Sequence, residues 1–163
     1  MLLEKREMKI INRQLLDDLT AAAQENPRLR KNWNIHPADD FPAHRLLNAM
    51  EPSSYIRPHR HLDPLKDETF MIVRGKLGIL ILDDDGAVKE KVLLDADGEC
   101  IGVDIPAGQF HTAVSLESGT IFFEAKAGPY IPLQDGEKPS WAPEDGLAGA
   151  EGYLAALKEE FQP

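Results

Sequence analysis

Three histidines and a glutamate occur at a spacing that fits a single metal site. His59 and His61 are two residues apart, Glu68 follows His61 by seven residues, and His111 comes fifty residues after His61, behind a Pro-x-Gly turn. In a β-strand, residues i and i+2 point to the same face, so the first two rings can reach one ion. Only a fold that brings distant strands together can join all four side chains. A small β-barrel does so.

Three imidazoles and one carboxylate form a complete ligand set for a divalent transition metal. The mixture of nitrogen and oxygen donors leaves the identity of the metal open among Zn, Fe, Ni and Mn. The other two histidines, His36 and His44, have no partner at ligand spacing and are expected to be structural.

The middle of the chain reads as a series of short strands separated by turns. No helical pattern interrupts this series, which argues for a closed barrel or jelly roll. The expected strands cover residues 44–50, 55–61, 68–74, 77–82, 88–94, 101–105, 111–116 and 120–126.

A helix is expected at each end of the chain. Residues 12–25 carry apolar side chains at helical spacing, and Asn12 is a suitable N-cap. Apolar residues from Leu147 to Phe161 mark a C-terminal helix with one apolar stripe. We therefore expect a single domain, in which segment 1–30 is helical, 31–130 forms the barrel, and 131–163 is a loop and helix packed on the barrel.

Composition limits the partners and the compartment. The net charge of -10 argues against nucleic acid as a partner, and no stretch approaches the roughly 20 apolar residues of a membrane span. The N-terminus lacks the apolar run of a signal peptide. The single cysteine, Cys100, cannot form an intrachain disulfide, which fits a reducing cytoplasm.

Several cations stand beside the metal motif in this acidic chain. Arg57, Arg60 and Lys66 lie within ten residues of the first two histidines, so a small anionic ligand is expected there. On a regular strand, Arg57 shares the face of His59 and His61. Its expected partner is Glu124 or the carboxylate or phosphate of a bound ligand.

The two histidine motifs resemble those of the cupins. His59, His61, Glu68 and Gly75 match the first cupin motif, and the segment from Pro106 to His111 matches the second. The wider chain is similar to the WbuC-type cupin metalloproteins around residues 45–49, 55–61, 123–130 and 141–143. The resemblance implies an all-β double-stranded β-helix with a divalent metal inside the barrel, and a homodimer.

Three positions depart from the general cupin pattern. Six residues separate His61 from Glu68, where three or four are usual, so the carboxylate could be displaced from the metal. Ser115 stands where the second motif often has Asn, and Ser53 stands where a Gly is common. The WbuC-type subgroup shares the long spacer, which keeps Glu68 in the expected ligand set.

Two functions remain open from the sequence. The first is a metal-dependent, isomerase-like enzyme acting on a small anionic carbohydrate in surface-polysaccharide sugar metabolism, as the resemblance implies. In that enzyme the metal would polarise a carbonyl, and Glu124 or Tyr130 would move a proton. The second is a non-catalytic metal- and ligand-binding cupin that acts as a sensor or regulator. An Fe-dependent oxygenase is a further alternative, because cupins host many chemistries.

Overall fold

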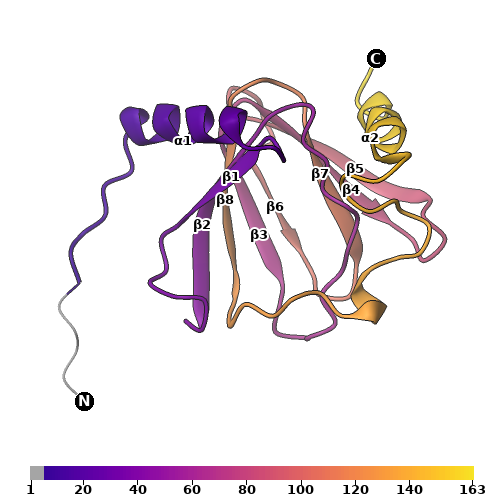
Figure 1. Cartoon of the computed structure of the whole chain (residues 1–163), viewed down its shortest axis with the longest axis horizontal. Helices are drawn as coiled ribbons and strands as arrows, with labels where there is room; N and C mark the ends of the chain where they lie inside the picture. The colour runs from indigo at the N-terminus through magenta and orange to yellow at the C-terminus, as the bar shows by residue number, and fades with distance from the viewer. Residues whose placement is uncertain (1–5) are drawn as a thin grey trace.

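The computed structural model describes residues 6–163, which form two antiparallel β-sheets facing each other with a helix on the outside of each (Figure 1). The five-stranded sheet has the order β1-β2-β8-β3-β6, and the three-stranded sheet has the order β5-β4-β7. In chain order, the elements are α1 (Arg13–Glu25), β1 (Arg30–Asn34), β2 (Ala43–Met50), β3 (Glu68–Arg74), β4 (Lys76–Leu82), β5 (Val88–Asp95), β6 (Gly102–Ile105), β7 (Phe110–Ser115), β8 (Thr120–Ala127), the 3-10 helix η1 (Asp135–Glu137) and α2 (Ala150–Glu159).

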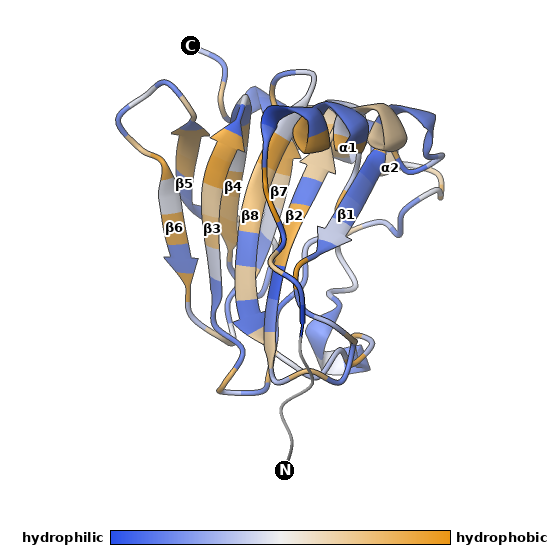
Figure 2. Cartoon of the chain, turned by 90° about the vertical axis from the view of Figure 1, so that its left-hand side faces the viewer, coloured by the Kyte–Doolittle hydropathy of each residue, from blue (hydrophilic) through white to orange (hydrophobic). Residues whose placement is uncertain are grey.

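This arrangement is the double-stranded β-helix of the cupins, so the fold class predicted from the sequence is confirmed. Hydrophobic and hydrophilic residues alternate along β8, in the middle of the five-stranded sheet (Figure 2). The inward-facing apolar residues form a core between the two sheets that includes Met50, Phe70, Ile72, Ile79 and Phe122. Burial of this core leaves one end of the barrel interior free for polar side chains.

The two helices pack on the outer faces of the sheets as their apolar stripes predict. Asn12 caps α1 as expected, because its Oδ1 accepts a hydrogen bond from the backbone N–H of Leu15 at 2.9 Å. Helix α1 packs Leu16, Leu19 and Ala23 on the outer face of the five-stranded sheet. Helix α2 packs Leu154 and Leu157 against β4 and β7 of the other sheet. No helix within residues 6–163 is long and apolar enough to cross a membrane.

One strand prediction was wrong, and one strand was not predicted. Residues 55–61 form no regular strand, and only His59 pairs there, in an isolated bridge to His111. Pro58 explains this, because it cannot donate a ladder hydrogen bond. The sequence also missed β1, which pairs Arg30 with Met50 of β2. That strand reads Arg-Lys-Asn-Trp-Asn and lacks the apolar alternation that marks a strand.

Gly75, the glycine of the first motif, makes the tight turn between β3 and β4. Its φ of 77° lies in the left-handed region, and a Cβ atom there would stand 2.6 Å from the hydroxyl oxygen of Thr120. A residue with a side chain would therefore both strain this turn and press on β8. The turn holds β3 in the register that places Glu68 at the site.

Candidate metal centre

The four residues singled out by spacing come together inside the barrel. His59 and His61 lie on the connection between β2 and β3, Glu68 begins β3, and His111 lies in β7. One potential ligand atom from each lies within 4.8 Å of the other three. The long spacer does not displace Glu68, since its loop returns the chain to the cluster. The four donors could hold one metal ion.

The bridge between His59 and His111 positions two of the rings. The backbone N–H of His59 donates to the carbonyl of His111 at 3.1 Å, and the N–H of His111 donates back at 2.9 Å. This pairing joins the irregular connection to β7, so the two rings stand with their centroids 4.7 Å apart. A short segment without regular strand pairing is thereby held in place at the site.

The hydrogen bonds of the rings suit metal binding. Nδ1 of His59 donates to the carbonyl of Arg57 at 3.0 Å, and Nδ1 of His111 donates to the carbonyl of Gln109 at 2.9 Å. A carbonyl can only accept, so these bonds orient each Nε2 toward the cluster, as in many metal-ligating histidines.

Glu68 lies between two imidazoles. Its Oε1 is 2.9 Å from Nε2 of His61, and its Oε2 is 2.8 Å from Nε2 of His111. Because Nδ1 of His111 already donates to a carbonyl, its Nε2 faces a carboxylate oxygen that can also only accept. Either a second proton on the ring or a metal ion satisfies both atoms. The donor set therefore fits a divalent ion.

Burial and charge set the ionisation of the cluster. Burial alone would raise the pKa of Glu68, but hydrogen bonds from His111 and His61 and the charge of Lys126 hold that pKa well below its usual value. Loss of water lowers the pKa of His59 to about 4, and the neighbouring His111 acts in the same direction. Burial also opposes the charged form of His111, but its hydrogen bond to Glu68 and that carboxylate's charge raise its pKa. The cluster therefore holds an anionic carboxylate and a neutral His59, which are the forms that bind metals.

A chain of polar side chains continues from Glu68 across the inner face of the sheet. Lys126 Nζ lies 3.1 Å from Oε1 of Glu68 and 2.6 Å from Oε1 of Glu124. Oε2 of Glu124 in turn accepts a hydrogen bond from Asn48 Nδ2 at 2.8 Å. Burial lowers the pKa of Lys126, but Glu124 and Glu68 together raise it above its ordinary value. We call Lys126, Glu124 and Asn48 the polar ladder.

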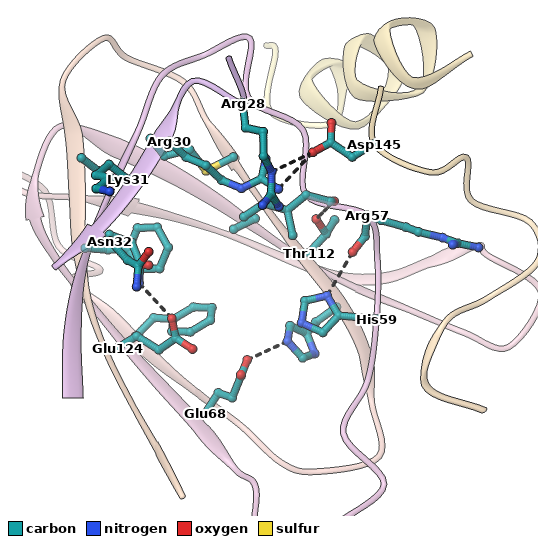
Figure 3. A pocket seen from close by; sticks show the side chains of 18 of the residues that line it. Arg28, Arg30, Lys31, Asn32, Arg57, His59, Glu68, Thr112, Glu124 and Asp145 are labelled. Carbon is teal, nitrogen blue, oxygen red and sulfur yellow. Dashed lines mark hydrogen bonds and ion pairs between the residues drawn. The ribbon is translucent and has the colours of Figure 1, made fainter. Parts of the chain in front are cut away.

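A cavity of about 690 Å³ is lined by His59, Glu68 and His111 of the cluster and by all three residues of the polar ladder. Figure 3 shows Glu68, His59 and Glu124 around this cavity, with Arg28 and Arg30 of the β1 region beside Asp145. A separate pocket of about 210 Å³ touches the other side of the cluster at His59 and His61. Candidate ligands can thus meet the cluster from two sides.

The structure distributes the other predicted site residues between these two spaces. Glu124 is buried and lines the large cavity. Its role in proton transfer stays a prediction. Tyr130 is 61% exposed and lines the small pocket instead. Lys66 is buried and lines the small pocket as well. The roles predicted for these residues stay predictions.

The two predicted arginines bind the C-terminal segment. Arg57 donates to Glu144 at 3.2 Å and to the carbonyl of Pro139, so neither Glu124 nor the cluster is its partner. In Figure 3 its side chain extends away from Glu68. Arg60 donates to the carbonyl of Gly136 and to Asp84, with its guanidinium over the ring of Phe110. The expected strand parity of Arg57 was wrong because residues 55–61 form no strand.

Sequence reasoning missed Lys126 and Asn48. Lys126 shares an inward face with Phe122 and Glu124, at the same two-residue period that relates His59 to His61. Because a strand was expected at 120–126, that period could have shown that Lys126 faces the same side as Glu124. Asn48 had no such signal, because its neighbours in β2 are mostly apolar.

The fold and the cluster together define a protein of cupin fold with a candidate metal site. A model of the family described as "Domain of unknown function (DUF6016)" matches residues 11–94. The chain belongs to this family. A search of curated protein sequences found no match.

Solved structures share the fold at low sequence identity. KdgF from Halomonas sp. is 17% identical, with a TM-score of 0.50, over 66% of this chain and 85% of that one. TT1209 from Thermus thermophilus is 20% identical, with a TM-score of 0.51, over 74% of this chain and 97% of that one. The capsular polysaccharide assembling protein CapF from Staphylococcus aureus is 20% identical, with a TM-score of 0.52, over 66% of this chain and 29% of that one. At these identities the likeness shows the fold alone. The similarity to the WbuC-type subgroup stays a prediction.

Proposed function

We propose that the protein binds one divalent transition metal ion through His59, His61, Glu68 and His111, and uses it to bind and transform a small anionic carbohydrate-type molecule. The convergence of four donor atoms within 4.8 Å supports the metal most strongly. The two backbone carbonyls that hold the Nδ1 atoms of His59 and His111 support it further.

The large cavity supports a carbohydrate-type ligand. Its volume of about 690 Å³ lies within the range of small-molecule sites. Amide, carboxylate and ammonium groups of the polar ladder stand along one wall, where they can pair with hydroxyl groups. The fold likeness to a capsular polysaccharide assembling protein motivates sugar nucleotides as the first compounds to test.

The polar ladder supports an enzyme over a passive binding protein. A bound divalent ion would polarise a carbonyl group of the ligand. In this proposal Glu124 is the group that accepts the proton, and its contacts with Lys126 at Oε1 and with Asn48 at Oε2 hold the carboxylate in place beside the cavity. An isomerase-like proton transfer beside that carbonyl is the concrete reaction. Tyr130, which lines the small pocket, is the alternative proton carrier.

The decisive experiment is elemental analysis of natively purified protein beside the double variant His59→Ala, His61→Ala. We expect stoichiometric metal in the wild type and none in the variant. The control is His36→Asn, which changes a buried histidine outside the cluster and should keep the metal. Full metal retention in the double variant would refute the assignment.

The reaction is tested separately on the metal-loaded protein. Sugar nucleotides and sugar acids are screened by calorimetry, and any ligand that binds is then followed for turnover by NMR. Turnover that disappears in Glu124→Gln supports the enzyme. Binding with no turnover identifies a sensor or regulatory protein instead.

A further inference from the structure

Lys66 is a buried cation without a counter-ion. It is 7% exposed, and its Nζ makes one hydrogen bond, to the carbonyl of Pro129 at 2.8 Å. Within residues 6–163, no carboxylate oxygen lies within 4.0 Å of this nitrogen. The contrast is with Lys126, which contacts two carboxylates. An ammonium carries three N–H donors, and burying it without an anion is costly.

Two lysines and three histidines line the pocket beside Lys66, together with apolar residues. It has a volume of about 210 Å³ and is lined by Lys66, Lys126, His44 and His61, with Tyr130 at its side. No Asp or Glu lines it, whereas Glu68, Glu124, Glu144 and Asp145 all line the large cavity. The nearby carboxylate of Glu137 is bound to the backbone N–H groups of Leu62 and Gln134, so it faces its own loop. Of the two lysines that line the pocket, only Lys66 lacks an anionic partner within residues 6–163.

We propose that this pocket is an oxyanion subsite, in which Lys66 binds the carboxylate or phosphate group of a small molecule. The anion would supply the missing counter-ion of Lys66 and accept its free N–H donors. The subsite lies against His61 of the cluster, so a bound acid would place its neighbouring atoms beside the residues that would hold the metal. In that respect the inference deepens the proposed function and rests on it.

The test is calorimetry with inorganic phosphate and with acetate on protein stripped of metal by a chelator. We expect Lys66→Gln, which keeps a donor for Pro129 but removes the charge, to weaken anion binding by roughly tenfold or more. Lys66→Arg, which retains the positive charge, should retain anion binding. The matched control is Lys89→Gln, which removes an equal charge from the exposed surface of β5 and should leave anion binding unchanged. Whichever anion binds more tightly identifies the acid group.

Melting curves separate this role from a structural one. Without anion, Lys66→Gln should melt at or above the wild-type temperature, since an uncompensated charge has been removed, and phosphate should no longer raise its melting temperature. Unchanged phosphate affinity in Lys66→Gln would overturn the proposal, as would a lowered melting temperature with phosphate stabilisation intact. NMR titration of the wild type gives a second measurement: shifts confined to β1 and β2 would also overturn it.

Because these measurements use metal-free protein, they succeed or fail independently of the metal assignment. Anion binding that occurs only in metal-loaded protein would place the anion on the ion itself and refute the subsite. Anion binding in a protein that never takes up metal would keep the subsite and refute the proposed function.

Discussion

Lys126 and Glu68 face each other directly across β8 and β3, with the ammonium nitrogen 3.1 Å from a carboxylate oxygen. That oxygen also contacts Nε2 of His61 at 2.9 Å. A candidate metal ligand thus forms a cross-strand ion pair, and the same lysine neutralises Glu124. In the metal-free protein, Lys126 therefore separates two buried carboxylates that would otherwise repel each other.

Replacing Lys126 should destabilise the metal-free protein. Lys126→Met leaves Glu68 and Glu124 buried without their cation, and breaking a buried pair typically costs about 3–5 kcal/mol. We expect a loss approaching that range, measured by urea unfolding. Adding Glu124→Gln to Lys126→Met should restore part of the loss because it removes one unpaired charge.

An exposed ion pair supplies the control for Lys126. Lys91 pairs with Glu160 at 2.9 Å on the surface, where such pairs contribute about 0–1 kcal/mol. Lys91→Met should therefore change the free energy of unfolding little. Equal effects of Lys91→Met and Lys126→Met would contradict the importance of the polar ladder.

Arg57→Ala tests whether this residue binds the ligand or the C-terminal segment. Its bonds to Glu144 and Pro139 hold that segment beside the large cavity. Charged hydrogen bonds contribute about 1.5–3 kcal/mol, so we expect a loss of stability of that order and unchanged phosphate affinity. Glu144→Gln, which alters only the exposed partner, should cost less. A roughly tenfold loss of affinity with an unchanged melting temperature would instead make Arg57 a ligand-binding residue.

His44 should make stability depend on pH. It is buried against His36, with ring centroids 4.0 Å apart, and burial followed by the charge of His36 lowers its pKa. A histidine with a folded pKa below its unfolded value of 6.5 contributes its full stability above pH 6.5. That stability is lost as the pH falls below 6.5, because the unfolded chain binds the proton more readily.

The measurement for His44 is unfolding of metal-free protein from about pH 8 to about pH 5, a range that spans the ordinary histidine pKa, in buffers that lack oxyanions. His59 acts in the same direction, so the comparison is between wild type and His44→Gln, whose amide can still donate to the carbonyl of Asp39. We expect a shallower loss of stability in the variant. Parallel curves for the two proteins would show that His44 does not contribute.

We expect a homodimer in solution, as the resemblance implies. The outer face of β3 and the residue before β6 expose Met71, Val73 and Ile101, beside an edge strand that a partner can cover. Light scattering should give twice the 18.1 kDa mass of the chain. The double change Met71→Lys, Val73→Lys should reduce the mass to that of a monomer. A monomer mass for the wild type across micromolar concentrations would refute the dimer.

The sequence predicted the barrel well because the signals were periodic and local. Short apolar runs bounded by turn residues marked β3, β4 and β8 close to their observed bounds, and the Pro-x-Gly turn precedes His111 at a fixed distance. The connection 55–61 was the exception. The two-residue spacing of His59 and His61 suggested a strand there. Instead, the histidines are positioned by a bridge to β7 and by an irregular backbone that contains proline.

The partners of the cations could not be predicted in the same way. Arg57 and Arg60 bond to residues about eighty positions away, in a C-terminal segment without periodicity. Lys66 lies in a loop whose course depends on tertiary contacts, so nothing local indicated its burial. Long-range contacts of irregular segments leave no pattern in the sequence.

The candidate ligands belong to different sheets. Glu68 lies in the five-stranded sheet and His111 in the three-stranded sheet, and strand pairing does not join the two. An ion held by both would act as a cross-link between the sheets, in the way a disulfide restricts a chain. Metal binding should therefore slow amide hydrogen exchange in β3 and β7 together, although the two strands share no backbone hydrogen bonds. A bound metal ion would in this way limit how far the two sheets can move apart.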